Sequence, residues 1–190
     1  MKITNDLTSL MPSLSAVQEL FKYFSENGII IGGVAASLLG KPRLTADVDA
    51  VIILPMEELP RLIEIAKQVG VFPRIIDAEE FARRHHVLLL RHQESGINVD
   101  ISIGMLPFEI EAVERGKVHQ AGQLAIRLPT PEDLIIFKAV AHRPKDLLDI
   151  QAVIECHPHL DKKRIQRWVK EFARVLEMPE IWDDISDWLK

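Results

Sequence analysis

The chain has 190 residues, 47% of them hydrophobic and 27% charged, a balance that is typical of a globular protein and excludes a disordered one. Its formal net charge of −5 excludes a polycationic surface, so nucleic-acid binding would require a local basic patch. The chain shows no signal-peptide core, no apolar run long enough to span a membrane, and only one cysteine, Cys156, which excludes an intrachain disulfide. We therefore expect a soluble cytoplasmic protein without a membrane partner.

The first third of the chain predicts helices that alternate with buried strands, because its apolar residues recur first at helical spacing and then in short unbroken runs. The predicted helices span residues 13–27, 34–39 and 57–69, and the predicted strands span residues 29–31 and 48–54. The pair Gly32-Gly33 follows the first strand directly, and Asp47 and Asp49 stand at the start of the second.

The middle of the chain predicts a short helix over residues 78–84 and then a hairpin with arms at 87–91 and 97–103. The second arm alternates apolar and polar residues, which places Asp100 at the centre of a polar strand face. A helix over 107–115 and a strand over 124–128 are expected next.

From Thr130 onward the pattern is entirely helical. The sequence Thr130-Pro131-Glu132-Asp133 is a helix start, with proline at the first position and acids in the first turn. Helices are predicted over residues 131–142, 145–156, 161–176 and 180–189. We expect an α/β (α+β) fold, with a mixed core over residues 1–129 and an all-helical C-terminal subdomain over 130–190.

The aspartates form the most informative group of residues in the chain. Residues two apart on a strand point to the same side, so Asp47 and Asp49 can share a cation. Their oxygen ligands favour Mg²⁺ or Mn²⁺, and Asp100 would complete a two-metal site or act as a general base. The alternative is that these acids are ordinary strand-end residues paired with arginines such as Arg43 or Arg91.

The Gly32-Gly33 turn would let backbone N–H groups approach a phosphate at a helix N-terminus. Two familiar phosphate-binding motifs are absent: the glycine spacing does not fit a P-loop, and there is no dinucleotide-binding G-x-G-x-x-G pattern. The histidines and Cys156 do not have a recognised zinc spacing.

Three segments occur in a characteristic order: Gly32-Gly33, the stretch R-L-T-A-D-V-D over residues 43–49, and Val99-Asp100. This order resembles the nucleotidyltransferase fold of the DNA polymerase β superfamily. Further on, P-E-D-L over residues 131–134, Lys138 and R-P-K-D-L-L-D over 143–149 are similar to the AbiEii-like branch, which includes toxins of toxin–antitoxin systems. One departure from many relatives is Val34, which stands where they carry a serine beside the glycine turn.

The resemblance implies a role for each matching residue. It implies catalytic roles for Asp47, Asp49, Asp100 and Lys145, with the three aspartates as the metal ligands. It implies nucleotide contacts from Gly32, Gly33, Arg43, Thr45, Lys138 and Asp146. The alternative for Lys145, Asp146 and Asp149 is that they form a helix start with acids in its first turns.

The implied activity is Mg²⁺-dependent transfer of a nucleoside monophosphate from an NTP to an acceptor hydroxyl, with release of pyrophosphate. The AbiEii-like resemblance implies tRNA or another RNA as acceptor and an antitoxin protein as partner. A small-molecule acceptor such as an aminoglycoside or lincosamide, a protein hydroxyl, and a catalytically silent nucleotide-binding module are the alternatives. The basic helix over 161–176 could guide RNA, or could be an ordinary solvated amphipathic helix.

Overall fold

A five-stranded mixed sheet forms the centre of the protein in the computed structural model, which describes residues 5–190. The strands are β1 (Gly28–Ile30), β2 (Asp47–Ile52), β3 (Val71–Pro73), β4 (Val87–His92) and β5 (Asn98–Ile103). Their order across the sheet is β1-β2-β5-β4-β3. The central strands β2 and β5 run parallel, and every other neighbouring pair runs antiparallel. Two segments distant in the sequence therefore meet at the middle of the sheet.

The two faces of the sheet differ in polarity. In β5 the residues Val99, Ile101 and Ile103 are buried and alternate with half-buried polar residues, as the sequence predicts. The strand register places Asp49 beside Asp100 on the polar face. We call this face, which carries Asp47, Asp49 and Asp100, the carboxylate face.

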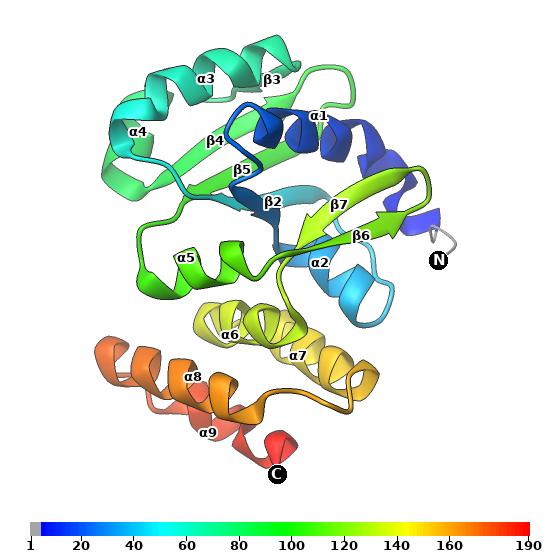
Figure 1. The fold of residues 1–190 in the computed structure, drawn as a ribbon, viewed down its shortest axis with the longest axis vertical. Helices are drawn as coiled ribbons and strands as arrows, with labels where there is room; N and C mark the ends of the chain where they lie inside the picture. Colours follow the sequence, from blue (N-terminus) through cyan, green and yellow to red (C-terminus); the bar gives the residue numbers. More distant parts are fainter. Residues whose placement is uncertain (1–4) are drawn as a thin grey trace.

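Helices enclose the sheet on both sides (Figure 1). The helices of this part are α1 (Met11–Lys22), α2 (Gly32–Leu39), α3 (Leu59–Gln68), α4 (Ala78–His85) and α5 (Pro107–Glu114), with 3-10 turns η1 (Asn5–Leu10) and η2 (Met56–Glu58). Helix α1 packs on α3 and on strands β2 and β3, whereas α2 and α5 contact β2. Helix α2 also packs on the C-terminal helices, so it connects the sheet to the rest of the chain.

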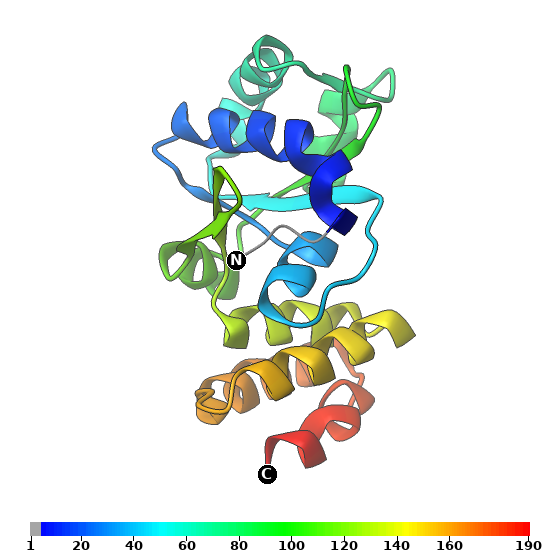
Figure 2. The ribbon, with the colours of Figure 1, turned by 90° about the vertical axis from the view of Figure 1, so that its right-hand side faces the viewer.

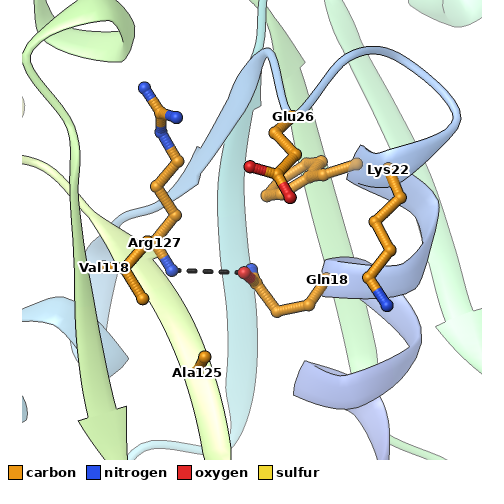
Figure 3. A pocket seen from close by; sticks show the side chains of 7 residues that line it. Gln18, Lys22, Glu26, Val118, Ala125 and Arg127 are labelled. Carbon is orange, nitrogen blue, oxygen red and sulfur yellow. Dashed lines mark hydrogen bonds between the residues drawn. The ribbon is translucent and has the colours of Figure 1, made fainter.

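A separate hairpin, β6 (Lys117–Ala121) with β7 (Leu124–Leu128), packs against α1 and β1. The backbone N–H of Arg127 donates to Gln18 Oε1 at 3.2 Å across a small hollow of about 120 Å³ (Figure 3). Two further N–H groups at this seam, on Gln18 and Arg127, are buried without a partner in the described residues. The hairpin thus covers the β1 edge of the sheet.

The C-terminal helices are stacked below the sheet in Figures 1 and 2. They are α6 (Pro131–Ala141), α7 (Pro144–Cys156), α8 (Lys162–Leu176), α9 (Glu180–Ser186) and the turn η3 (Asp187–Leu189). The Thr130 hydroxyl caps α6 by accepting a hydrogen bond from the N–H of Asp133. Division of the chain into subdomains at Thr130 stays a prediction. No helix within residues 5–190 is both long and apolar enough to cross a membrane.

The basic side chains of α8 take part in packing. Arg164, whose side chain is 9% exposed, donates to Asp133 at 2.7 Å and to Glu111 at 2.6 Å. Arg167 lies over the Trp168 ring and also pairs with Glu111. These contacts hold α8 against α5 and α6, and they favour the structural interpretation of this helix over RNA guidance.

The structure departs from the predicted elements mainly at short or irregular segments. Helix α1 ends at Lys22 rather than at residue 27, because Ser25 and Glu26 adopt positive φ angles of 55° and 56°. Helix α2 begins at Gly32 itself rather than at residue 34. Strands β3 and β6 were not predicted, since β3 has three residues including Pro73 and β6 is mostly exposed.

Candidate active site

Three carboxylates lie together at the middle of the carboxylate face. Asp49 and Asp100 occupy matching register positions of the parallel strands β2 and β5, where neighbouring strands are about 4.8 Å apart. Asp47 precedes Asp49 by two residues on the same strand and therefore points to the same face. The strand register therefore places residue 100 next to Asp49, and a shared role for the three acids stays a prediction.

Asp49 lies in an environment that disfavours its charged form. Its pKa is raised above the usual value by burial first, and then by repulsion from Asp47 and Asp100. The cations Lys138 and Arg143 oppose this shift without cancelling it. A site that holds like charges together at this cost is suited to binding a cation.

The glycine turn lies directly against the carboxylates. Gly32 has a φ of +62°, and a Cβ at this position would stand 1.9 Å from Asp49 Oδ2. A Cβ at Gly33 would stand 2.3 Å from the Thr45 hydroxyl oxygen, and that hydroxyl donates to Asp47 at 3.0 Å. Both glycines are therefore needed for the close approach of the α2 N-terminus to β2. Val34, the departure noted in the sequence, is buried in the core, whereas Thr45 places a hydroxyl beside the turn.

Gly32→Ala should destabilise the protein by about 2 kcal/mol or more, because alanine at a positive φ costs about 1–2 kcal/mol and its methyl group would also displace Asp49. Denaturant unfolding would measure the loss. Gly96→Ala is the matched control, since Gly96 also has a positive φ but a Cβ there would meet no atom within 4 Å. Equal losses in the two variants would show that the contact with Asp49 does not constrain this turn.

Asp100 is held by an arginine that the sequence did not reveal as a site residue. Arg74 follows β3 and forms a two-pronged ion pair with Asp100, in which Nη2 donates to Oδ2 at 3.1 Å and Nη1 contacts Oδ1. The sequence suggests Arg43 and Arg91 as partners for the acids, and neither of them contacts Asp100 in the structure. The register shows why Arg74 takes this place: its N–H continues the β3–β4 ladder by donating to Leu89, which pairs with Asp100.

A buried charge network from α6 and α7 faces the carboxylates. Lys138, which is 4% exposed, contacts Asp146 and Asp149 at 2.8 Å each. Asp149 also receives two hydrogen bonds from Arg43, at 2.7 and 2.9 Å. Arg143 donates from Nε to Asp146 at 2.5 Å. Three cations thus surround two acids, which leaves one net positive charge near the negative side chains of the sheet.

The residues predicted to bind nucleotide differ in how far they are exposed to solvent. Burial raises the pKa of Asp146, but hydrogen bonds from Arg143 and Lys138 outweigh burial, so the net shift is downward. Lys138 and Asp146 are buried, whereas about half of the Arg143 side chain is exposed. Lys145 is exposed and makes no ion pair with any described residue. Arg143, which was not predicted as a site residue, is therefore the more exposed arginine of the network.

Within residues 5–190, no group of three or more His, Cys, Asp or Glu side chains is already arranged to hold a metal ion. Asp100 is engaged by Arg74, which contacts both of its carboxylate oxygens. Asp47 and Asp49 have no ion pair with the described residues. The assigned roles of all these residues remain predictions.

Comparison with known proteins identifies the family. A family model described as "Nucleotidyltransferase of unknown function (DUF6036)" matches residues 6–180, nearly the whole chain. The chain belongs to this family. A search of curated proteins finds no match to this nucleotidyltransferase.

Two solved structures resemble this nucleotidyltransferase over most of its length. One is an antigenic nucleotidyltransferase-like protein from Paracoccidioides brasiliensis, with a TM-score of 0.54, 16% identity, and coverage of 100% of this chain and 94% of that one. The other is the antibiotic-resistance factor ANT(2'')-Ia, with a TM-score of 0.54, 15% identity, and coverage of 90% and 96%. At such low identity these likenesses establish the fold alone, and they confirm the predicted nucleotidyltransferase α/β core.

Proposed function

We propose that this nucleotidyltransferase transfers a nucleoside monophosphate from an NTP to a hydroxyl of RNA, at the site formed by β2, β5 and the start of α2. The observation that carries this proposal is the register that sets Asp49 beside Asp100, directly against the glycine turn. The triphosphate would lie between this turn and two arginines, the half-buried Arg43 and the exposed Arg143.

In the proposed reaction the acceptor oxygen forms a bond to the α-phosphorus, and the bond from that phosphorus to the bridging oxygen breaks. Pyrophosphate leaves with the electron pair, and the carboxylate of Asp100 takes the proton of the acceptor hydroxyl. The backbone N–H groups at Gly32 and Gly33, together with Arg43 and Arg143, neutralise charge on the phosphates. Lys145 is exposed at the start of α7 and stays a candidate for the same task.

The acids present fit a hard divalent cation such as Mg²⁺ or Mn²⁺. The donor set is composed of carboxylate oxygens. The pKa of Asp49 is raised by burial first and then by repulsion from Asp47 and Asp100, and a bound cation would relieve that repulsion. Asp47, Asp49 and Asp100 would hold the ion, and Asp100 could serve only after Arg74 releases it. When bound, the ion would supply charge neutralisation for the triphosphate.

The resemblance of the P-E-D-L and R-P-K-D-L-L-D segments to the AbiEii-like branch supports tRNA or another RNA as acceptor. It also supports a toxin role in the cytoplasm that a partner antitoxin would restrain. A second candidate is nucleotidyl transfer to a small antibiotic. It is favoured by the shared fold with ANT(2'')-Ia, which is an antibiotic-resistance factor.

The test incubates the full chain with each α-labelled NTP, Mg²⁺ or Mn²⁺, and one of three acceptors: total RNA, an aminoglycoside or a protein extract. We expect metal-dependent label on RNA, and no label after chelation. Label on the aminoglycoside alone would establish the second candidate, and label on the extract alone would identify a protein acceptor. Absence of transfer in every arm would contradict the enzyme proposal and favour a nucleotide-binding module.

A further inference from the structure

A second surface feature of the carboxylate face lies beyond Asp100, at the β3–β4 edge of the sheet. It is an open hollow of about 480 Å³ lined by Phe72, Pro73, Arg74, Arg91 and Gln93. Arg74 both lines the hollow and holds Asp100, so the hollow borders the proposed reaction site. None of the nucleotide contacts proposed above uses it.

The strand register fixes how the hollow is related to the acids. Phe72 pairs with Arg91, Arg91 with Asn98, and Asn98 with Asp47, so all four share the carboxylate face. Strand β5 lies between β4, which carries Arg91, and β2, which carries Asp47. Because neighbouring strands are about 4.8 Å apart, the backbones at Arg91 and Asp47 are roughly 10 Å apart.

The lining of the hollow is cationic in a protein whose net charge is −5. Two of the five lining residues are arginines and none is acidic. Arg74 is neutralised by Asp100, but the exposed Arg91 donates only to the neutral side chain of Asn98, at 3.1 Å, and forms no ion pair within residues 5–190. The remaining guanidinium N–H groups of Arg91 are therefore available to an anion.

An aromatic side chain, Phe72, lies next to Arg91 on the carboxylate face. Phe72 is 38% exposed on the edge strand β3, directly opposite Arg91. An exposed ring beside an unpaired guanidinium is the combination that binds single-stranded nucleic acid, because bases stack on the ring while phosphates pair with the cation. A polycationic antibiotic would be repelled by the uncompensated charge of Arg91.

We propose that this hollow binds the end of a single-stranded RNA acceptor, with Arg91 on a backbone phosphate and Phe72 stacked on a base. The proposal rests on the function proposed above and specifies where the acceptor lies. The RNA would enter over the β3–β4 edge, and its terminal hydroxyl would reach Asp100. An anion arriving in the hollow would also compete for Arg74, which is the group that must release Asp100.

The test measures equilibrium binding of a short fluorescent oligoribonucleotide with a free terminal hydroxyl to the full chain, over a range of salt concentrations. Arg91→Glu should weaken binding about ten-fold and reduce the slope of log affinity against log salt by about 0.7, the value for one lost phosphate contact to a single strand. Phe72→Ala should weaken binding by a similar factor with an unchanged slope, and Phe72→Leu should not rescue it. Arg174→Glu, the same charge reversal on an exposed arginine of α8, is the control.

Binding of NTP and thermal unfolding serve as further readouts, and Arg91→Glu should leave both unchanged. If Arg91→Glu and Arg174→Glu reduce RNA affinity equally, the effect is one of overall charge and the hollow is not the acceptor site. If hollow variants bind and label RNA normally, this inference fails while the proposed function stands. Labelling of an aminoglycoside by the wild-type chain that is lost in Phe72→Ala would overturn the inference, because it would show that the hollow receives a cation.

Discussion

Asp49→Asn should reduce nucleotidyl transfer about 10³-fold and at the same time make the protein more stable. Activity falls because the variant loses the central carboxylate of the site, which lies beside Asp100 and against the glycine turn. Stability rises because the neutral amide is not repelled by Asp47 and Asp100, and its burial costs less than that of a charge. Thermal unfolding would report a gain of about 1 kcal/mol, which corresponds to roughly 2–4 °C for a chain of this size.

The opposite signs of the two effects are the informative part of this experiment. Asp183→Asn, which removes the same charge from an exposed position on α9, should change neither quantity measurably. A loss of both activity and stability in Asp49→Asn would indicate that Asp49 is a structural residue. Unchanged activity would exclude it from the catalytic machinery.

Lys138→Met should destabilise the protein by about 3–5 kcal/mol, because it leaves the buried carboxylates of Asp146 and Asp149 without their shared cation. The remaining partners, Arg143 and Arg43, each contact only one of these acids. Denaturant unfolding would measure the loss as a lower midpoint with an unchanged slope.

Lys145→Met is the matched control, since it makes the same substitution seven residues later at an exposed position. It should leave stability within about 0.5 kcal/mol of the wild type, the usual range for surface substitutions. If Lys145 takes part in catalysis, as the family resemblance implies, this variant will lose activity while it remains fully folded. Equal stability of the two variants would show that the network around Lys138 contributes little to the fold.

Strand alternation and the family resemblance predicted the aspartates of the candidate site, but not the arginine that pairs with one of them. Asp47, Asp49 and Asp100 follow from strand alternation and from the family resemblance. Arg74 could not be found in this way, because it follows a three-residue strand that has no recognisable periodicity. Its position depends on the β3–β4 pairing, which is a contact between segments separated by a helix.

Local sequence patterns also did not predict the ion-pair partners of Arg43 and Lys138. Arg43 was expected either at a strand acid or at phosphate, and the structure pairs it with Asp149, over a hundred positions later. Lys138 and Asp146 are eight residues apart, but the positive φ of His142 ends α6 and turns the chain so that they meet. Such contacts are set by how helices pack, which a single sequence does not record.

The parallel pairing of β2 with β5 has a consequence for biosynthesis. Asp49 and Asp100 are about fifty residues apart, and α3, β3, α4 and β4 lie between their two strands in the sequence. Long-range pairing of this kind forms slowly relative to local helices. A ribosome-bound fragment that ends before residue 98 lacks Asp100 and the strand that carries it, so the proposed site is incomplete until β5 has been synthesised.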